Sequence, residues 1–318
     1  MDHHQRLPGR GPLTQLYLGG PIEIPTRFPN VFTVDVEDWY QGIEIDMKDW
    51  DRFSPRIEIG LQILLDLLEG SGTRATFFVL GFQAERTPRL IRTIAERGHE
   101  VASHGYLHRF VYQQSPDEFR TELRRSKALL EDITGTAVLG FRAPYFSITA
   151  QSLWALDILA EEGFAYDSSV FPVMNYRYGI LGASRHPGWL RTENGNRIYE
   201  VPLSTVRLPY PTSPIGLNVP LSGGGYFRLY PYVVTRALSK LLQREGQGLV
   251  FYVHPWEYDA LQPRIRMPRL VPELTHYYNL ESMVEKTRRL LRDFRFGTMR
   301  AAFGDDLGYG GKGGDGAS

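Results

Sequence analysis

Short apolar segments alternate with amphipathic helical segments along most of this chain, and that order restricts the fold more than any other feature. A short apolar run predicts a buried strand, whereas apolar residues three and four positions apart predict one buried face of a helix. Strands and helices that alternate without a break in composition predict a parallel sheet covered by helices. We therefore expect one α/β domain.

The pattern predicts seven strands separated by helices with recognisable ends. The strands are expected at residues 31–35, 73–80, 99–103, 138–141, 164–166, 198–203 and 249–253. The helix after residue 54 has an apolar stripe formed by Ile57, Leu61, Leu64, Leu65 and Leu68. Ser115 and Glu118 have the spacing of a capping box at the start of another helix. A closed barrel and an open doubly wound sheet both satisfy this order.

Polar clusters follow several of these strands, which favours a barrel because barrel active sites lie at the carboxyl ends of the strands. We place the barrel domain at residues 29–303. Residues 1–28 are rich in glycine and proline and predict a flexible arm, and the glycine-rich residues 304–318 predict a disordered tail.

Composition excludes several classes of function. Lys and Arg together number 36, as do Asp and Glu, so no net charge attracts nucleic acid or an anionic membrane surface. The absence of cysteine excludes disulfides and thiolate metal sites, which leaves histidine and carboxylate as ligands. The longest apolar run, residues 75–80, is too short to span a bilayer, and the N-terminus lacks a signal-peptide pattern. We expect a soluble, cytoplasmic protein without a nucleic-acid partner.

Two histidines, His104 and His108, stand four residues apart directly after the third predicted strand. That spacing is about one helical turn, so both rings can lie on one side and bind a divalent metal with an open position for water. A cluster of carboxylates, Asp35, Glu37 and Asp38, follows the first strand. Crowded carboxylates need a cation or an arginine nearby in order to stay ionised together.

Three further clusters also follow predicted strands. Arg142 stands at a strand end ahead of a rigid Ala143-Pro144-Tyr145 turn, where it can pair with a buried carboxylate in bidentate fashion. Asp167 ends another strand, although Asp-Ser-Ser is also common turn chemistry. His254 ends a strongly apolar strand, where an idle histidine would be poorly solvated.

Together the five clusters resemble the motifs of polysaccharide deacetylases of the NodB-homology class, carbohydrate esterase family 4. The matching segments are Val34-Asp35-Val36-Glu37-Asp38-Trp39, His104-x-x-x-His108, Arg142-Ala143-Pro144-Tyr145, Asp167-Ser168-Ser169 and Phe251-Tyr252-Val253-His254. The similarity runs from about residue 32 to residue 303 and is greatest to the branch associated with exopolysaccharide gene clusters and exosortase systems. It implies a distorted barrel of about seven strands, in agreement with the strand count.

The resemblance also implies an activity: hydrolysis of N-acetyl groups from amino-sugar residues of a bacterial polysaccharide, as in exopolysaccharide biosynthesis. His104, His108 and one carboxylate of the first cluster would hold Zn²⁺, or alternatively Co²⁺, Mn²⁺ or Ni²⁺. Asp35 would be the general base, and Arg142 would orient it. The backbone N–H of Tyr145 would stabilise the oxyanion, and His254, its pKa raised by Asp167, would protonate the leaving amine.

Most members of that class have two adjacent aspartates, base then ligand, at the first motif, and this chain departs from that pattern. In an extended strand Glu37 shares a face with Asp35, whereas Asp38 points away unless the chain turns there. We therefore expect Glu37 to be the third metal ligand and keep Asp38 as the alternative.

Two other functions compete with this prediction. A related amidohydrolase of the allantoinase-like or cyclic-imidase kind would share the barrel and cleave a small ring amide. A catalytically inactive module would bind the sugar without hydrolysing it. The expected partner is an N-acetylated polysaccharide, either free or lipid-linked at the cytoplasmic membrane face, and the oligomeric state is not predicted.

Overall fold

The computed structural model describes residues 28–308 except 44, 174–176, 181, 211–212 and 268–269. Its strands are β1 Asn30–Val36, β2 Thr76–Val79, β3 Glu100–Ser103, β4 Gly140–Phe141, β5 Tyr166–Asp167, β6 Gly188–Arg191, β7 Arg197–Glu200, β8 Thr205–Tyr210, β9 Ser213–Pro220, β10 Val250–Val253 and β11 Phe296–Gly297. Its helices are α1 Ile57–Gly70, α2 Gly81–Arg86, α3 Pro88–Glu96, α4 Pro116–Thr134, α5 Trp154–Glu161, α6 Gly224–Leu229, α7 Tyr232–Arg244, α8 Leu270–Tyr277, α9 Met283–Asp293 and α10 Met299–Phe303.

The central sheet contains seven parallel strands in the order β10-β1-β2-β3-β4-β5-β7. These are the seven strands that the apolar pattern predicts. β6 adds to β7 in antiparallel orientation, and β11 pairs with the start of β1. Every residue of β1 is buried, as expected for a central parallel strand covered on both faces.

The sheet curves into a barrel-like form without closing through backbone hydrogen bonds between β7 and β10, as far as the described residues show. Instead, the side chain of Ser204, in the segment that leads from β7 to β8, contacts β10. Its Oγ accepts a hydrogen bond from the backbone N–H of Val250 at 2.8 Å and donates to the carbonyl of Gly248 at 3.4 Å. The fold is therefore a mixed α/β, distorted and incompletely closed barrel, which confirms the predicted fold class.

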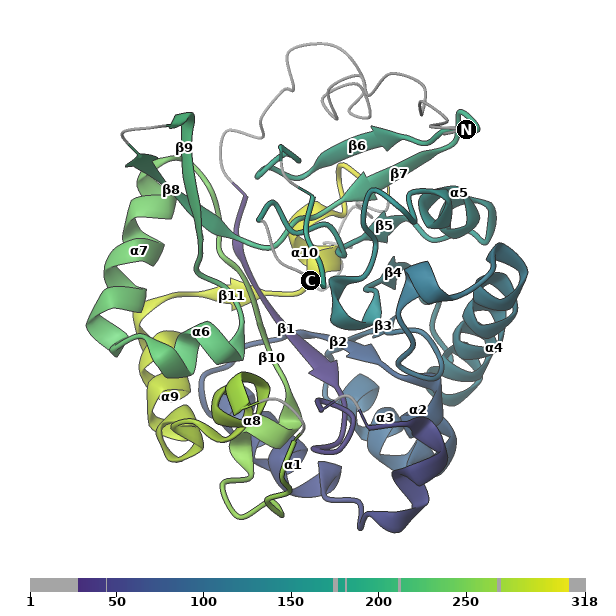
Figure 1. Ribbon diagram of the computed structural model, residues 1–318, viewed down its shortest axis with the longest axis horizontal. Helices are drawn as coiled ribbons and strands as arrows, with labels where there is room; N and C mark the ends of the chain where they lie inside the picture. The colour runs from purple at the N-terminus through teal and green to yellow at the C-terminus, as the bar shows by residue number, and fades with distance from the viewer. Residues whose placement is uncertain are drawn as a thin grey trace, which may run out of the picture.

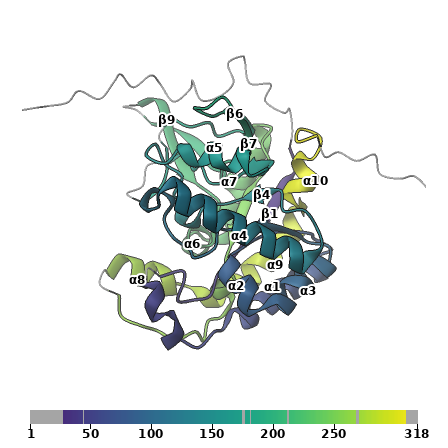
Figure 2. The same cartoon turned by 90° about the vertical axis from the view of Figure 1, so that its right-hand side faces the viewer.

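Helices lie outside the sheet (Figure 1), and their buried faces are those that the apolar spacing predicts. In α1 the whole predicted stripe is buried, with Leu61, Leu64, Leu65 and Leu68 fully enclosed. At the start of α4 the capping box forms with both hydrogen bonds: Ser115 Oγ accepts from Glu118 N–H, and Glu118 Oε2 accepts from Ser115 N–H. Seen from the side (Figure 2), α4 and α5 run across the face turned toward the viewer.

Several elements have no counterpart in the prediction. The proline-rich stretch around residues 208–220 forms most of a hairpin, β8 and β9, which is a separate two-stranded sheet beside α7.

The predicted flexible arm lies outside the described residues except at Phe28, and the predicted tail lies outside them from residue 309. Leu307 is buried near Phe28 and Phe303. In the part of the chain that the structure covers, no helix has the length and apolar character to cross a membrane.

Candidate metal centre and active site

Side chains from four strands meet at one end of the sheet because neighbouring parallel strands end at the same edge. Asp35 lies in β1 and Glu37 directly follows it. His104 follows β3, Arg142 follows β4 and His254 follows β10. The structure thus brings together residues that are up to 219 positions apart in the sequence.

Glu37, His104 and His108 form a group that fits a metal ion. Glu37 Oε1 lies 3.4 Å from His104 Nε2 and 3.2 Å from His108 Nε2, and all three side chains are buried. Ligand atoms about 2.0–2.1 Å from a tetrahedral metal are separated from one another by about 3.3 Å. The two distances from Glu37 Oε1 to the imidazole nitrogens match that separation.

The hydrogen bonding of the two imidazoles supports the same conclusion. His104 Nδ1 lies 2.8 Å from the carbonyl oxygen of Arg142, which can only accept, so Nδ1 carries the proton. The Nε2 atom is then an unprotonated donor atom for a metal, and it is buried without a hydrogen-bond partner. Both ring nitrogens of His108 are likewise buried without one. A divalent cation bound to the two Nε2 atoms would satisfy one otherwise unpartnered nitrogen of each ring.

The charges in this group also suit a metal. Burial alone would raise the pKa of Glu37, but the imidazoles of His108 and His254 outweigh it and hold that pKa well below its usual value. Burial lowers the pKa of His108. Glu37 is therefore a carboxylate and His108 a neutral imidazole at neutral pH, the forms in which these side chains bind metals.

Asp38 binds backbone N–H groups, and the structure does not support it as the third metal ligand. One of its oxygens accepts from the backbone N–H of Arg56 at 2.9 Å and of Ile57 at 3.2 Å, and the other accepts from Trp39 N–H at 2.8 Å. The N–H groups of a helix's first turn lack partners within the helix. Asp38 therefore caps α1 from a distance, and its oxygens are occupied away from the histidines.

Arg142 holds Asp35 in place. Its Nη1 donates to Asp35 Oδ1 at 2.7 Å and to Thr33 Oγ1 at 2.7 Å. Its other nitrogens donate to the carbonyl and hydroxyl of Ser168. The guanidinium is completely buried and lies 4.1 Å from the centre of the Phe78 ring. Arg142 thus pairs with Asp35 through one nitrogen and one oxygen rather than in the bidentate fashion expected, and Asp35 lies beside Glu37 and His254.

Asp167 does not contact His254, so the expectation that it raises the pKa of His254 is corrected. Its Oδ1 accepts a hydrogen bond from Ser169 Oγ, which in turn accepts from the backbone N–H of Ala143. Burial raises the pKa of Asp167 to about 6, next to the buried Glu200. Asp167 therefore supports the turn that follows Arg142 rather than the histidine.

The partner of His254 is Glu257, whose carboxylate accepts from both the backbone N–H and the ring Nδ1 of His254, at 2.9 and 3.2 Å. Arg228 Nε donates to the other oxygen of Glu257 at 3.0 Å. Burial would lower the pKa of His254, but the negative charges of Glu37, Glu257 and Asp35 raise it to about 9. In the metal-free protein His254 is thus charged at neutral pH, and two of these three carboxylates, Glu257 and Asp35, are not proposed metal ligands.

A sequence signal for Glu257 exists, because residues 254 and 257 have the i, i+3 spacing of a capping box with a proline directly after the first position. Gly224 makes room for this carboxylate: a Cβ atom on Gly224 would lie 1.8 Å from Glu257 Oε2. The run Gly223-Gly224-Gly225 therefore allows the start of α6 to pack closely against the carboxylate.

Tyr145 lies in the turn after Arg142 with positive backbone angles, φ 55° and ψ 18°, and Phe146 follows with φ 53°. Such strain in non-glycine residues is characteristic of functional sites. The Tyr145 ring packs 4.3 Å from the His108 ring, centre to centre, and its hydroxyl donates to the carbonyl of Gln41. The structure thus places Tyr145 beside His108, one of the three proposed metal ligands. The role of its backbone N–H as a donor to the oxyanion stays a prediction.

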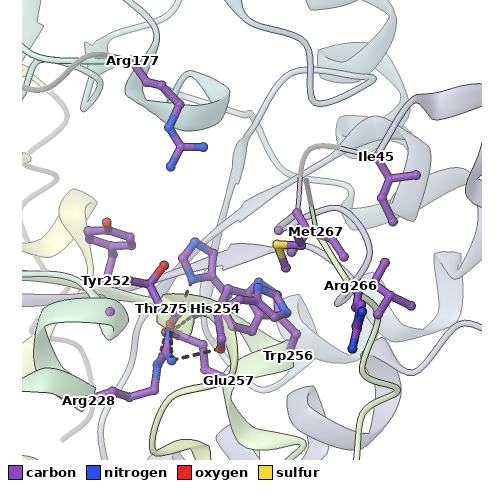
Figure 3. A pocket seen from close by; sticks show the side chains of 15 residues that line it. Ile45, Arg177, Arg228, Tyr252, His254, Trp256, Glu257, Arg266, Met267 and Thr275 are labelled. Atoms are coloured by element: carbon purple, nitrogen blue, oxygen red, sulfur yellow. Dashed lines mark hydrogen bonds and ion pairs between the residues drawn. The ribbon is translucent and has the colours of Figure 1, made fainter. Parts of the chain in front are cut away.

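An open cavity of about 400 Å³ borders His254 (Figure 3). Trp256 lines it but offers no ring face to a sugar, because the rings of His254 and His276 stack on it at 5.2 and 4.0 Å. The cavity is the space in which a substrate can approach His254.

Comparison with known proteins divides the chain into two matched segments. Residues 60–164 match the family model described as polysaccharide deacetylase, and residues 168–304 match a domain of unknown function, DUF3473. The resemblance to polysaccharide deacetylases is thereby confirmed for the first segment. Because β2 to β4 lie in the first segment and β7 and β10 in the second, both segments contribute to one sheet. The second supplies His254, Glu257 and Arg228, while Asp35 and Glu37 precede both.

Two curated relatives illustrate the similarity. A peptidoglycan-N-acetylglucosamine deacetylase of Bacillus cereus is 33% identical over 106 residues, which cover 33% of this chain and 36% of that protein. The peptidoglycan deacetylase-like protein FGM2 of Gibberella zeae is 30% identical over 178 residues, which cover 53% of this chain and 49% of that protein. The matches thus span half or less of the length of either relative.

The fold has a counterpart among solved structures. A Mycobacterium smegmatis structure described as a presumed polysaccharide deacetylase is 24% identical, with a TM-score of 0.58. The alignment covers 92% of this chain and 94% of that one. At this level of identity the likeness shows that the fold is shared.

Proposed function

We propose that this protein hydrolyses N-acetyl groups of amino-sugar residues in a bacterial polysaccharide, releasing acetate and leaving a free amine. It would thus be a hydrolase of carbon–nitrogen bonds in linear amides. The observation that carries the proposal is the convergence of a metal-competent group, Glu37, His104 and His108, with the Asp35–Arg142 pair and with His254. The match of residues 60–164 to polysaccharide deacetylases and the printed activity of the Bacillus cereus relative support it.

A divalent cation held by Glu37, His104 and His108 would polarise the amide carbonyl and lower the pKa of bound water. Asp35 accepts the proton of the water whose oxygen forms the new bond to the carbonyl carbon. Arg142 keeps the Asp35 carboxylate aimed at that water. The carbon–nitrogen bond then breaks, and His254 gives its proton to the departing nitrogen, which leaves as the amine.

Two residues support these roles without reacting. Glu257 holds the His254 ring through Nδ1. The other ring nitrogen, Nε2, then lies 3.5 Å from Glu37 Oε1. Tyr145 closes one side of the site by packing on His108, and its backbone N–H is proposed as the donor to the oxyanion.

The narrower parts of the proposal concern the metal and the biological setting. Zn²⁺ suits a site of two imidazoles and one carboxylate, and Co²⁺, Mn²⁺ or Ni²⁺ could take its place. We also propose a role in exopolysaccharide biosynthesis, in the branch associated with exosortase systems, and a cytoplasmic location, at the membrane face if the glycan is lipid-linked.

Acetate release tests the proposal. The metal-loaded protein is incubated with N-acetylglucosamine oligomers, peptidoglycan fragments and, as rival substrates, allantoin and cyclic imides. Acetate from an oligomer is expected, with loss of about 10²-fold or more in Asp35→Asn and His254→Ala. Asp132→Asn, a change of an exposed carboxylate on α4, is the matched control. Cleavage of a ring amide alone would favour the amidohydrolase, and binding of oligomers without any turnover would favour the sugar-binding module.

A further inference from the structure

The two histidines of the metal group differ in what holds their second ring nitrogen. His104 Nδ1 lies 2.8 Å from the carbonyl oxygen of Arg142, which orients that ring. His108 Nδ1 is also buried, but no group among the described residues makes a hydrogen bond with it. A histidine that binds a metal through one nitrogen almost always donates its other N–H to a carboxylate, a carbonyl or a water molecule. The His108 ring therefore needs a further acceptor when its Nε2 binds a metal.

A small cavity of about 10 Å³ borders His108. Its walls come from the segment that follows β3, from α4 and from the turn after β4. Within the part of the chain that the structure covers, neither Glu37 nor His104 lines this cavity, so it does not lie between the three proposed ligands. A volume of about 10 Å³ is close to the smallest that can hold a water molecule, and it is too small for a larger ligand.

Gln114 lines the same cavity and carries a suitable acceptor. Its Nε2 donates to the carbonyl oxygens of Arg109 and Phe110, at 3.5 and 3.4 Å. Because carbonyl oxygens only accept, the nitrogen must face them, which identifies the other amide atom as the oxygen. This oxygen, Oε1, is buried, and nothing in the described residues donates to it. The cavity is thus bordered by one side chain that has a donor N–H to satisfy and by another that has an acceptor to satisfy.

The backbone around Gln114 is attached to the turn that contains Tyr145. The N–H of Gln114 donates to the carbonyl of Val111 at 3.0 Å, and the N–H of Val111 donates to Ser147 Oγ at 2.9 Å. The same turn presents the Tyr145 ring to the His108 ring, 4.3 Å away between ring centres. Gln114 and His108 are therefore both packed against one turn, with the small cavity as part of their shared surroundings.

We propose that one water molecule in this cavity connects His108 with Gln114, accepting a hydrogen bond from His108 Nδ1–H and donating one to Gln114 Oε1. Gln114 is then a positioning residue, because through the water it orients the imidazole whose Nε2 binds the metal. Glu122, which also lines the cavity, offers an acceptor for the second hydrogen of the water. The inference rests on the metal site of the proposed function and adds a residue to it.

Zinc affinity tests the inference without turnover. The dissociation constant of Zn²⁺ is measured by competition with a chromogenic chelator. Gln114→Met keeps the length of the side chain and removes the acceptor, so it should weaken Zn²⁺ binding by about tenfold or more. Gln113→Met, an exposed change at the preceding residue, is the matched control and should bind Zn²⁺ as the wild type does. Equal affinity of the Gln114 variant and the control overturns the inference.

Two further measurements separate orientation of His108 from a general effect on folding. Chemical denaturation of the metal-free proteins should give similar midpoints for Gln114→Met and the control, so that the lost affinity belongs to the metal site. A crystal structure of the zinc-loaded wild type should contain a water about 2.7–3.2 Å from both His108 Nδ1 and Gln114 Oε1. If Gln114→Met is destabilised, this crystal structure decides. A direct hydrogen bond between the two side chains, or the absence of this water, overturns the inference.

Failure of this inference can be distinguished from failure of the proposed function. If the wild type binds zinc and releases acetate while Gln114→Met binds zinc equally tightly, the inference fails and the proposed function stands. If the tenfold difference in zinc affinity is found but no glycan releases acetate, the inference stands and the deacetylase function fails. A wild type that binds no divalent metal overturns both.

Discussion

Glu257 accepts hydrogen bonds from both the backbone N–H and the ring Nδ1 of His254, so a single carboxylate fixes the backbone and the side chain of the same histidine. Arg228 holds the carboxylate from its other side. All three residues lie in the segment that matches a domain of unknown function. That segment therefore supplies the proposed proton donor, whereas His104 and His108, the proposed metal ligands, lie in the segment that matches polysaccharide deacetylases.

Replacement of Glu257 by glutamine should lower kcat by about 10²-fold with little change in KM, because His254 loses the charge that orients and ionises its ring. Steady-state acetate release measures both parameters. Glu257→Asp should recover part of kcat because it restores the charge. Glu58→Gln, an exposed change on α1, serves as the control. A kcat for Glu257→Gln equal to that of the control would contradict the assignment.

Gly224→Ala should disturb the site through contact with Glu257. The new Cβ would lie 1.8 Å from the carboxylate, so the carboxylate must move or the protein loses about 1–3 kcal/mol of stability. Both acetate release and the thermal midpoint should fall. Gly225→Ala in the same helix is the matched control, since its Cβ meets nothing within 4 Å. Equal stability of the two variants would argue against close packing at residue 224.

Metal content should separate Glu37 from Asp38. Glu37→Gln should lose bound metal because it removes a charged ligand, whereas Asp38→Ala should keep metal and lose about 1–2 kcal/mol of stability as the start of α1 loses its cap. Elemental analysis of the purified proteins and chemical denaturation give the two readouts. Full metal in Glu37→Gln together with depleted metal in Asp38→Ala would reverse the assignment.

Acid should destabilise the fold through His99. Burial, with the charges of Arg74 and Arg97, lowers the pKa of this histidine to about 4 in the folded protein, against about 6.5 when unfolded. The folded state therefore favours the neutral ring, which accepts a hydrogen bond from Ala75 N–H. The stability that the neutral His99 ring gives the folded protein is complete above pH 6.5. It is lost as the pH falls toward 4, which lowers the free energy of unfolding by about 2–3 kcal/mol.

Denaturant unfolding of the wild type and His99→Gln at several pH values between 7 and 4 checks this effect. The variant should be less stable at pH 7 and should lose less stability on acidification, so the two curves should converge. Parallel curves would show that another group controls the acid response.

The order of strands and helices could be predicted because it depends on local patterns. Apolar runs and cap signals identified all seven parallel strands, the buried stripe of α1 and the capping box of α4. Parallel strands end at a common edge, so residues placed after their ends had to meet. The approach of Asp35, Glu37, His104, Arg142 and His254 therefore follows from the sequence pattern together with this rule.

The choice between neighbouring or chemically equivalent groups required the tertiary structure. Glu37 and Asp38 are both buried carboxylates one residue apart, and the distant N–H groups of Arg56 and Ile57 decide which of them remains available to the histidines. Asp167 and Glu257 could each have paired with His254, and only the packing of α6 brings Arg228 and the small Gly224 against Glu257. These outcomes depend on contacts between residues far apart in the chain, for which local spacing carries no information.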